Sequence, residues 1–147
     1  MKKIVGLLMF IGVLQINAQS NAQLLKHYED FYVQMKAQGD VQGVINALTH
    51  INILQPNDAR KDTLAMLYMN EGKHMQAINT IGFEVDENDS DMAVEVKAVS
   101  LKSMNQIELS VEHFELLYKR NPNVLIAYEL ADMKIQLNKL TEASLKL

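Results

Sequence analysis

Apolar residues follow a helical spacing from residue 23 onward and are interrupted at regular intervals. A first stripe, with steps of three and four, ends at Gly39 and contains Leu24, Tyr28, Phe31, Tyr32 and Met35. A second stripe ends at Pro56 and contains Val41, Val44, Ile45, Leu48 and Ile51. Such steps place residues on one face of an amphipathic helix, whereas a half-buried strand alternates every two residues, a pattern that this chain does not show. The pattern predicts an all-α protein with helices stacked in antiparallel pairs.

The helical pattern itself repeats every 33 residues. The positions that end the first helix of each unit are Gly39, Gly72, Asn105 and Asn138. In the second helices, the same spacing relates Val41, His74, Ile107 and Leu140, then Val44, Ala77, Ser110 and Ala143, and then Leu48, Ile81, Phe114 and Leu147. Self-similarity at a fixed period of roughly 20–50 residues is typical of a solenoid, in which each unit buries its apolar face against its neighbours. We therefore expect an α-solenoid of about 3.5 to 4 repeats.

This spacing predicts helix–turn–helix units at residues 23–56, 58–89, 91–122 and 124–147, the last of them incomplete. Glycine, and to a lesser degree asparagine, tolerates the left-handed conformation that closes a helix. Four helix ends are therefore predicted at Gly39, Gly72, Asn105 and Asn138. Pro56 and Pro122 lack the backbone N–H that a helix interior needs, and they predict unit boundaries. Asp58 and Asp91 occupy the expected N-cap positions of the units that they open.

The fourth unit is short. Its second helix is expected to begin near Leu140, which leaves about two turns, too few for a helix that is stable without packing. Leu145 and Leu147 also lack the polar outer face that normally finishes a solenoid. We expect either that the chain is a fragment of a longer protein or that its end docks against a partner or another copy. A frayed terminus is the alternative.

The second unit carries the most regular set of repeat residues, which is Leu64, Ala65, Tyr68, Gly72, Ala77 and Ile81. This order resembles the tetratricopeptide repeat, a family of paired antiparallel helices with a period of about 34 residues. The third unit keeps Ala98, Leu101, Asn105, Ser110, Phe114, Leu117 and Pro122, and the first and fourth match less fully. The resemblance implies close helix–helix contacts at Ala65, Ala77, Ala98, Ala131 and Ala143. Lys97 in place of an apolar residue and Asp89 in place of a proline depart from the family pattern.

The resemblance also implies a concave groove lined by the first helix of each unit. Its implied residues are Lys26, Glu29, Val33, Lys36, Ala59, Asp62, Met66, Met69, Asn70, Met92, Glu95, Val99, Lys102, Ser103, Leu125, Tyr128, Asp132, Ile135 and Gln136. Glu29, Asp62 and Glu95 form an acidic row, and the methionines add a deformable apolar floor that suits varied partners. Some family members bind a peptide carboxylate here with lysine and asparagine, which an acidic row does not support. A solvated helix face without a ligand is the alternative interpretation.

The N-terminal segment has the pattern of a secretory signal peptide. Lys2 and Lys3 precede an apolar run over residues 4–14, and a polar stretch with a small residue at Ala18 follows. An apolar run of this length covers roughly 16 Å, about half of a bilayer's hydrocarbon core, so an anchoring helix is the weaker alternative. We expect residues 1–18 to be removed and residues 19–147 to form the repeat domain of a protein exported by a bacterium, periplasmic or secreted.

Candidate catalytic chemistry is sparse. The four histidines are His27, His50, His74 and His113, and none forms a pair at metal-ligand spacing. The positions equivalent to His74 in the other repeat units hold apolar residues, so we expect His74 to pack against the core rather than to belong to a functional site. The chain has no cysteine, which excludes disulfides, thiolate metal sites and thiol catalysis. No nucleotide-binding, hydrolase or metalloprotease motif occurs, and we predict no catalytic residue, metal or cofactor.

An acidic cluster between the second and third units has some features of a calcium loop. Asp86, Asn88 and Ser90 occupy the first, third and fifth places of such a loop. The sixth and twelfth places, which require glycine and a bidentate glutamate, hold Asp91 and Lys97. Because two required features are missing, we expect a solvated turn that caps the next helix.

Composition narrows the class of partner. The chain is 48% hydrophobic and 22% charged, as ordinary folded proteins are, and its formal net charge of −4 becomes more negative once Lys2 and Lys3 are removed. Nucleic-acid binders are usually basic, so we expect a protein or peptide partner with basic and apolar segments. The sequence after residue 18 has no apolar segment long enough to predict a membrane span. The sequence thus predicts a non-catalytic protein-interaction scaffold. A structural or accessory subunit of a larger envelope assembly, and the regulatory part of a longer protein, are the open alternatives.

Overall fold

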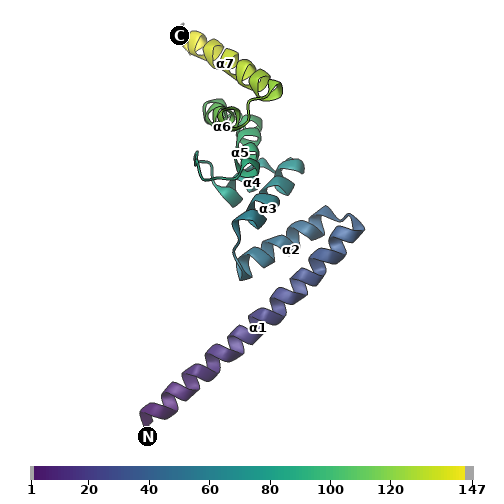
Figure 1. Cartoon of the computed structure of the whole chain (residues 1–147), viewed down its shortest axis with the longest axis vertical. Helices are drawn as coiled ribbons and strands as arrows, with labels where there is room; N and C mark the ends of the chain where they lie inside the picture. Colours follow the sequence, from purple (N-terminus) through teal and green to yellow (C-terminus); the bar gives the residue numbers. More distant parts are fainter. Residues whose placement is uncertain (1, 145–147) are drawn as a thin grey trace. The chain divides into compact units, whose positions relative to one another are not determined.

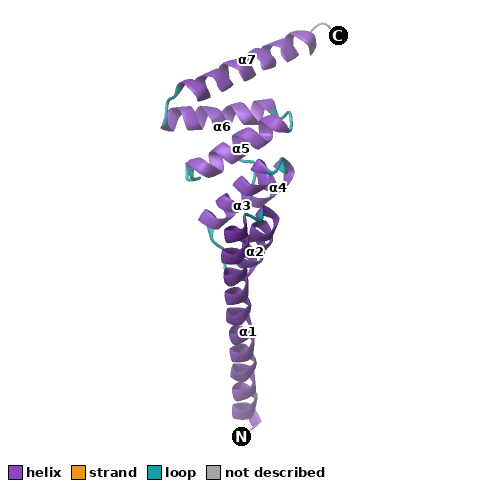
Figure 2. Cartoon of the chain, turned by 90° about the vertical axis from the view of Figure 1, so that its right-hand side faces the viewer, coloured by secondary structure: helices purple, strands orange, loops and turns teal. Residues whose placement is uncertain are grey.

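The structure is a computed structural model that describes the backbone of residues 2–144 and the side chains of residues 20–138. The described residues form α-helices joined by loops, without a strand (Figures 1 and 2), which confirms the all-α prediction. The helices are α1 (Lys2–Gln38), α2 (Val41–Leu54), α3 (Asp58–Asn70), α4 (His74–Ile81), α5 (Asp91–Ser103), α6 (Ile107–Arg120) and α7 (Val124–Ser144). They divide into two compact units, residues 1–57 and residues 58–147.

The first unit is a hairpin of α1 and α2. Gly39 closes α1 in the left-handed conformation, with φ of +71°, and the Asp40 side chain then caps α2 by accepting a hydrogen bond of 3.0 Å from the Gly43 N–H. Across the hairpin, the Tyr28 ring stacks on the His50 ring with a centroid distance of 4.3 Å. A Cβ atom at residue 43 would overlap the Met35 side chain, so the two helices approach closely at this glycine.

The second unit packs neighbouring helices against one another in chain order. Contacts join α3 to α4 and α5, α4 to α5, α5 to α6, and α6 to α7. One core cluster lies among α5, α6 and α7 and includes Val94, Ala98, Phe114, Leu117, Leu130 and Met133. A smaller cluster joins α3, α4 and α5 through Ala65, Ala77 and Val96. The pairing of adjacent helices is consistent with a helical repeat fold.

Small residues are buried between the helices at three positions where close contacts were predicted. Ala65, Ala77 and Ala98 are fully buried, and the Ser110 hydroxyl donates a 2.8 Å hydrogen bond to the Ala98 carbonyl. An added side chain would have no room at such contacts, which explains why these positions are small. The predicted helix ends are also confirmed at Gly72, with φ of +71°, and at Asn105, the only described non-glycine residue with a positive φ, at 59°.

The fourth unit differs from the prediction. Helix α7 continues through Asn138 to Ser144 as a single helix, so the helix end predicted at Asn138 is wrong. Ala131, predicted to lie at a close contact, is exposed, and no described helix packs over it. Asparagine tolerates a helix interior at a modest cost. The side chains of Leu140, Ala143 and Leu147 lie outside the described residues.

The start of α5 also differs by one residue from the prediction. Ser90, rather than Asp91, is the N-cap, and its hydroxyl accepts a 3.0 Å hydrogen bond from the Ala93 N–H. Asp91 is instead the first residue of the helix, where its negative charge still interacts favourably with the helix dipole. The preceding helix α4 ends at Ile81, and Gly82 then takes a φ of +83°, which turns the chain into the α4–α5 loop, residues 82–90.

The N-terminal segment begins the long helix α1. The helix runs without interruption from Lys2, so the signal-peptide boundary predicted after Ala18 does not coincide with a helix end. The side chains of residues 1–19 lie outside the described part of the chain. No helix among the described residues combines the length and the hydropathy that a bilayer span requires.

Candidate protein-interaction site

A recess of the second unit lies where α5 meets the end of α6 and the start of α7. Its volume is about 380 Å³, and it is lined by Asp91, Glu95, Val99, Phe114, Leu117, Asn121, Asn123, Leu125, Ile126 and Glu129. We call it the α5–α7 recess. Its size falls within the range of roughly 300–1,000 Å³ that ligand-binding clefts occupy.

The floor of the α5–α7 recess is apolar. Phe114 and Leu117 belong to the buried core, and Val99 and Ile126 are half-buried against it. Leu125 is 77% exposed and lines the same recess. An apolar side chain entering the recess would remove the exposed parts of Val99, Leu125 and Ile126 from water, which is favourable at about 25 cal/mol for each Å² buried.

The α6–α7 turn positions this apolar wall. The Asn123 carboxamide oxygen accepts a 3.0 Å hydrogen bond from the Ile126 N–H, which is an N-cap contact for α7. Pro122 stands just before this cap and cannot continue α6 with a backbone hydrogen bond. The start of α7, and with it Leu125 and Ile126, is therefore fixed by the residues of the turn.

Three carboxylates line the recess, and two of them already have a cationic partner. The Arg120 guanidinium donates a 2.9 Å hydrogen bond to the Asp91 carboxylate, and the Lys102 ammonium pairs with Glu129. Glu95 is exposed and has no hydrogen-bond or ion-pair partner among the described residues. The α5–α7 recess therefore presents one uncompensated negative charge beside an apolar floor.

The predicted groove residues divide between the two units. In the second unit, the structure brings Glu95, Val99 and Leu125 together in the recess. Lys102 lies on the same helix as Glu95, and its pairing with Glu129 joins α5 to α7. The predicted groove residues of the first unit, Glu29, Val33 and Lys36, are exposed on α1, and the Lys36 ammonium lies 5.7 Å from the centre of the Tyr32 ring.

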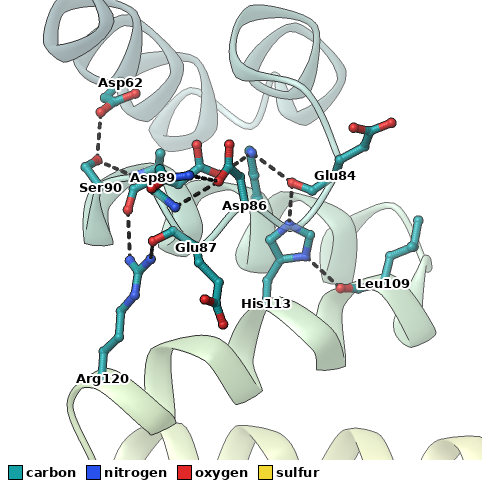
Figure 3. Close-up of polar contacts among 12 residues, drawn as sticks. Asp62, Glu84, Asp86, Glu87, Asp89, Ser90, Leu109, His113 and Arg120 are labelled. Carbon is teal, nitrogen blue, oxygen red and sulfur yellow. Dashed lines mark hydrogen bonds and ion pairs between the residues drawn. The ribbon is translucent and has the colours of Figure 1, made fainter.

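The groove residues on α3 are partly used for packing. Met66 and Met69 pack against the core cluster of Ala65, Ala77 and Val96, so they are not a free apolar floor. Asp62 accepts a 2.7 Å hydrogen bond from the Ser90 hydroxyl (Figure 3), which ties α3 to the residue that caps α5. Asn70 is exposed at the end of α3.

The groove residues on α7 beyond the recess face water. Tyr128 is 72% exposed, and Asp132 is exposed and accepts a 2.8 Å hydrogen bond from Gln136 on its own helix. Neither residue lines the α5–α7 recess. The acidic residues of the predicted row, Glu29, Asp62 and Glu95, therefore have three different environments, and Glu95 is the one that lines the α5–α7 recess.

Sequence reasoning noted two departures from the repeat pattern, Lys97 and Asp89, without relating them. In the structure they form a buried ion pair of 2.5 Å, and Lys97 is only 3% exposed. The Lys97 ammonium also donates a 2.9 Å hydrogen bond to the Glu84 carbonyl. A buried ammonium needs such partners because its desolvation is costly. Lys97 in the core and Asp89 in the loop thus form a single ion pair.

Two residues of α6, His113 and Arg120, also make polar contacts with the α4–α5 loop (Figure 3). The ring nitrogens of His113, which is fully buried, lie 2.8 Å from the Leu109 carbonyl oxygen and 3.3 Å from the Glu84 carbonyl oxygen. Arg120 donates to the carbonyls of Asp89 at 2.9 Å and Glu87 at 2.6 Å. Arg120 thereby connects the α4–α5 loop to Asp91, a residue of the recess. No sequence motif marked the contacts that His113 and Arg120 make with the α4–α5 loop, since they join residues about 30 positions apart.

The acidic cluster forms the turn that the sequence predicted. The Asp86 carboxylate accepts a 2.8 Å hydrogen bond from the Asn88 backbone N–H and a 2.9 Å hydrogen bond from the Asn88 side chain. These hydrogen bonds, with smaller contributions from Lys97 and Arg120, hold the pKa of Asp86 below its usual value of 3.8. Within the described residues, no three His, Asp or Glu side chains are arranged to hold a metal ion.

Comparison with known proteins does not assign this chain to a group. No protein-family model matches it, and no curated protein is significantly similar to it.

Proposed function

We propose that this protein is a non-catalytic interaction scaffold of the tetratricopeptide-repeat type, which binds a segment of another protein at the α5–α7 recess. The observation that carries the proposal is the recess itself, with an apolar floor of core residues beside acidic side chains. Three of the groove residues that the repeat resemblance implies, Glu95, Val99 and Leu125, line it. Protein-interaction surfaces combine a desolvated apolar centre with a polar rim in the same way.

The proposal is tested by binding to the intact protein. A random-peptide phage library is selected on the immobilised wild-type protein and, in parallel, on the Leu125→Ser variant. Because Leu125 is largely exposed, this substitution removes apolar surface from the recess with little effect on the core. We expect peptides with apolar residues to be enriched on the wild-type protein and to be lost on the variant. Equal recovery from the wild-type protein and the bare support would contradict the proposal.

A second candidate function is that of a structural subunit in a larger envelope assembly, and one observation favours it. Helix α7 exposes the apolar side chains of Leu125, Tyr128 and Ile135, which are 77%, 72% and 52% exposed. Several large apolar side chains exposed on one helix favour a protein contact. Light scattering at increasing protein concentration tests this alternative, which predicts self-association that Tyr128→Lys abolishes.

We further propose that the protein is exported by a bacterium and acts in the periplasm or outside the cell. The support is the sequence of the first 18 residues, with Lys2 and Lys3 before the apolar run and a small residue at Ala18. A fold without cysteine needs no disulfide chemistry in that environment and is stabilised by packing alone.

A further inference from the structure

The pairing of charges around the α5–α7 recess specifies its ligand further than the shape does. Two of its carboxylates, Asp91 and Glu129, have their charge balanced by Arg120 and Lys102 within the protein. An ion already paired offers little additional attraction, since a second cation would meet a nearly neutral pair. Only Glu95 keeps an unbalanced charge next to the apolar floor.

We infer that the α5–α7 recess binds a protein segment in which an apolar side chain is adjacent to a single lysine or arginine. The apolar side chain fills the space over Val99, Phe114 and Ile126, and the cation pairs with Glu95. This inference rests on the proposed function and adds the chemistry of the partner. An acidic segment is disfavoured, because its carboxylate would face Glu95 without a compensating cation.

The cation is expected to contribute selectivity more than affinity. Glu95 is exposed, and an ion pair between exposed charges contributes little binding free energy. Its loss should therefore change the dissociation constant only about two- to fivefold. Selectivity against acidic segments is larger, since repulsion replaces attraction. Because water and salt reach Glu95, the preference should weaken as ionic strength rises.

The test uses random-peptide phage selection on the full chain and on two charge variants. Glu95→Lys reverses the unpaired charge, and Glu112→Lys is the matched control, since Glu112 is an exposed glutamate of α6 that does not line the recess. Lysine or arginine next to an apolar residue should be enriched on the wild-type protein and on Glu112→Lys. On Glu95→Lys, the basic preference should disappear or become acidic. Thermal unfolding of the three proteins confirms that they are equally folded.

A synthetic copy of the most enriched peptide then provides the quantitative readout. By fluorescence anisotropy, Glu95→Gln should weaken its binding about two- to fivefold, and Glu112→Gln should leave it unchanged. Apolar peptides enriched without a basic residue, or a peptide insensitive to Glu95→Gln, would overturn this inference while leaving the scaffold function standing. Recovery no better than from the bare support would overturn both.

Discussion

Lys97 shows how one residue connects the core to a loop. Its ammonium is buried beneath the α4–α5 loop, where the Asp89 carboxylate and the Glu84 carbonyl are its partners. The tetratricopeptide repeat that the sequence resembles has an apolar residue at this place and a proline at the place of residue 89. The two departures compensate each other, because the cation that replaces the apolar residue is neutralised by the carboxylate that replaces the proline.

Removing one member of this pair should therefore destabilise the protein more than removing both. We expect Asp89→Asn to lower the free energy of unfolding by about 3 kcal/mol, because it leaves a buried ammonium without its counterion. Adding Lys97→Met should recover much of that loss, since an apolar side chain needs no partner. Urea unfolding followed by circular dichroism measures this double-mutant cycle. Additive losses in the two single variants would show that Lys97 and Asp89 act independently.

Asp86 makes a pH-dependent contribution to stability. Its pKa is lowered in the folded protein, chiefly by the hydrogen bond from the Asn88 backbone N–H, so folding favours the ionised carboxylate. This contribution is fully present above the usual pKa of 3.8 and is lost as the pH falls through the lowered value.

We expect Asp86→Asn to be less stable than the wild-type protein at neutral pH, with a difference that shrinks below pH 3.8 and then vanishes. Thermal unfolding of both proteins across this range measures the difference. Glu112→Gln serves as the control for removing one exposed negative charge. A difference that stays constant as the pH falls would mean that the ionised carboxylate is not the stabilising form.

At the scale of elements, two asparagines at equivalent positions of successive repeat units have different backbone conformations. Asn105 takes a φ of 59° where α5 gives way to α6, whereas Asn138, 33 residues later, lies inside α7. The difference arises from packing, because α6 folds back over α5 and supplies the contacts that hold the turn. No described helix follows α7 to do the same.

The same substitution should therefore have opposite effects at these two positions. Asn105→Ala should destabilise the protein by about 1–2 kcal/mol, because a Cβ-bearing residue other than asparagine is strained in the left-handed region. Asn138→Ala should stabilise α7 by up to about 0.7 kcal/mol, since alanine has the highest helix propensity. Thermal unfolding and helix content by far-ultraviolet circular dichroism measure both. Destabilisation by Asn138→Ala would mean that α7 breaks at Asn138, as the repeat pattern alone predicts.

At the scale of the whole molecule, the charge pattern of the N-terminus leads to a prediction about processing. If residues 1–18 are a signal peptide, the exported protein should begin at Gln19. Intact-mass spectrometry of the protein from the periplasm or the medium measures this directly. Ala18→Leu is the control, since a bulky residue at the cleavage point should block removal. Recovery of exported wild-type protein that still carries Met1 would show that no cleavage occurs.

The sequence alone predicted the features that depend on short-range rules. The helical spacing of apolar residues, the small residues at Ala65 and Ala98, and the left-handed helix end at Gly72 agree with the structure. These features are local because backbone conformation and residue size act within a turn or between neighbouring helices. Two of the groove residues that the repeat resemblance implies, Glu95 and Val99, line the α5–α7 recess.

Only the tertiary structure decided the features that depend on which helices meet. It paired Lys97 with Asp89, connected the α4–α5 loop to His113 and Arg120, and kept Asn138 within a helix. It also gave Asp62 a hydrogen bond from Ser90 and left Glu95 without a partner among the described residues. Burial and charge compensation belong to the assembled packing and not to any single segment, so the spacing of residues along the chain could not specify them.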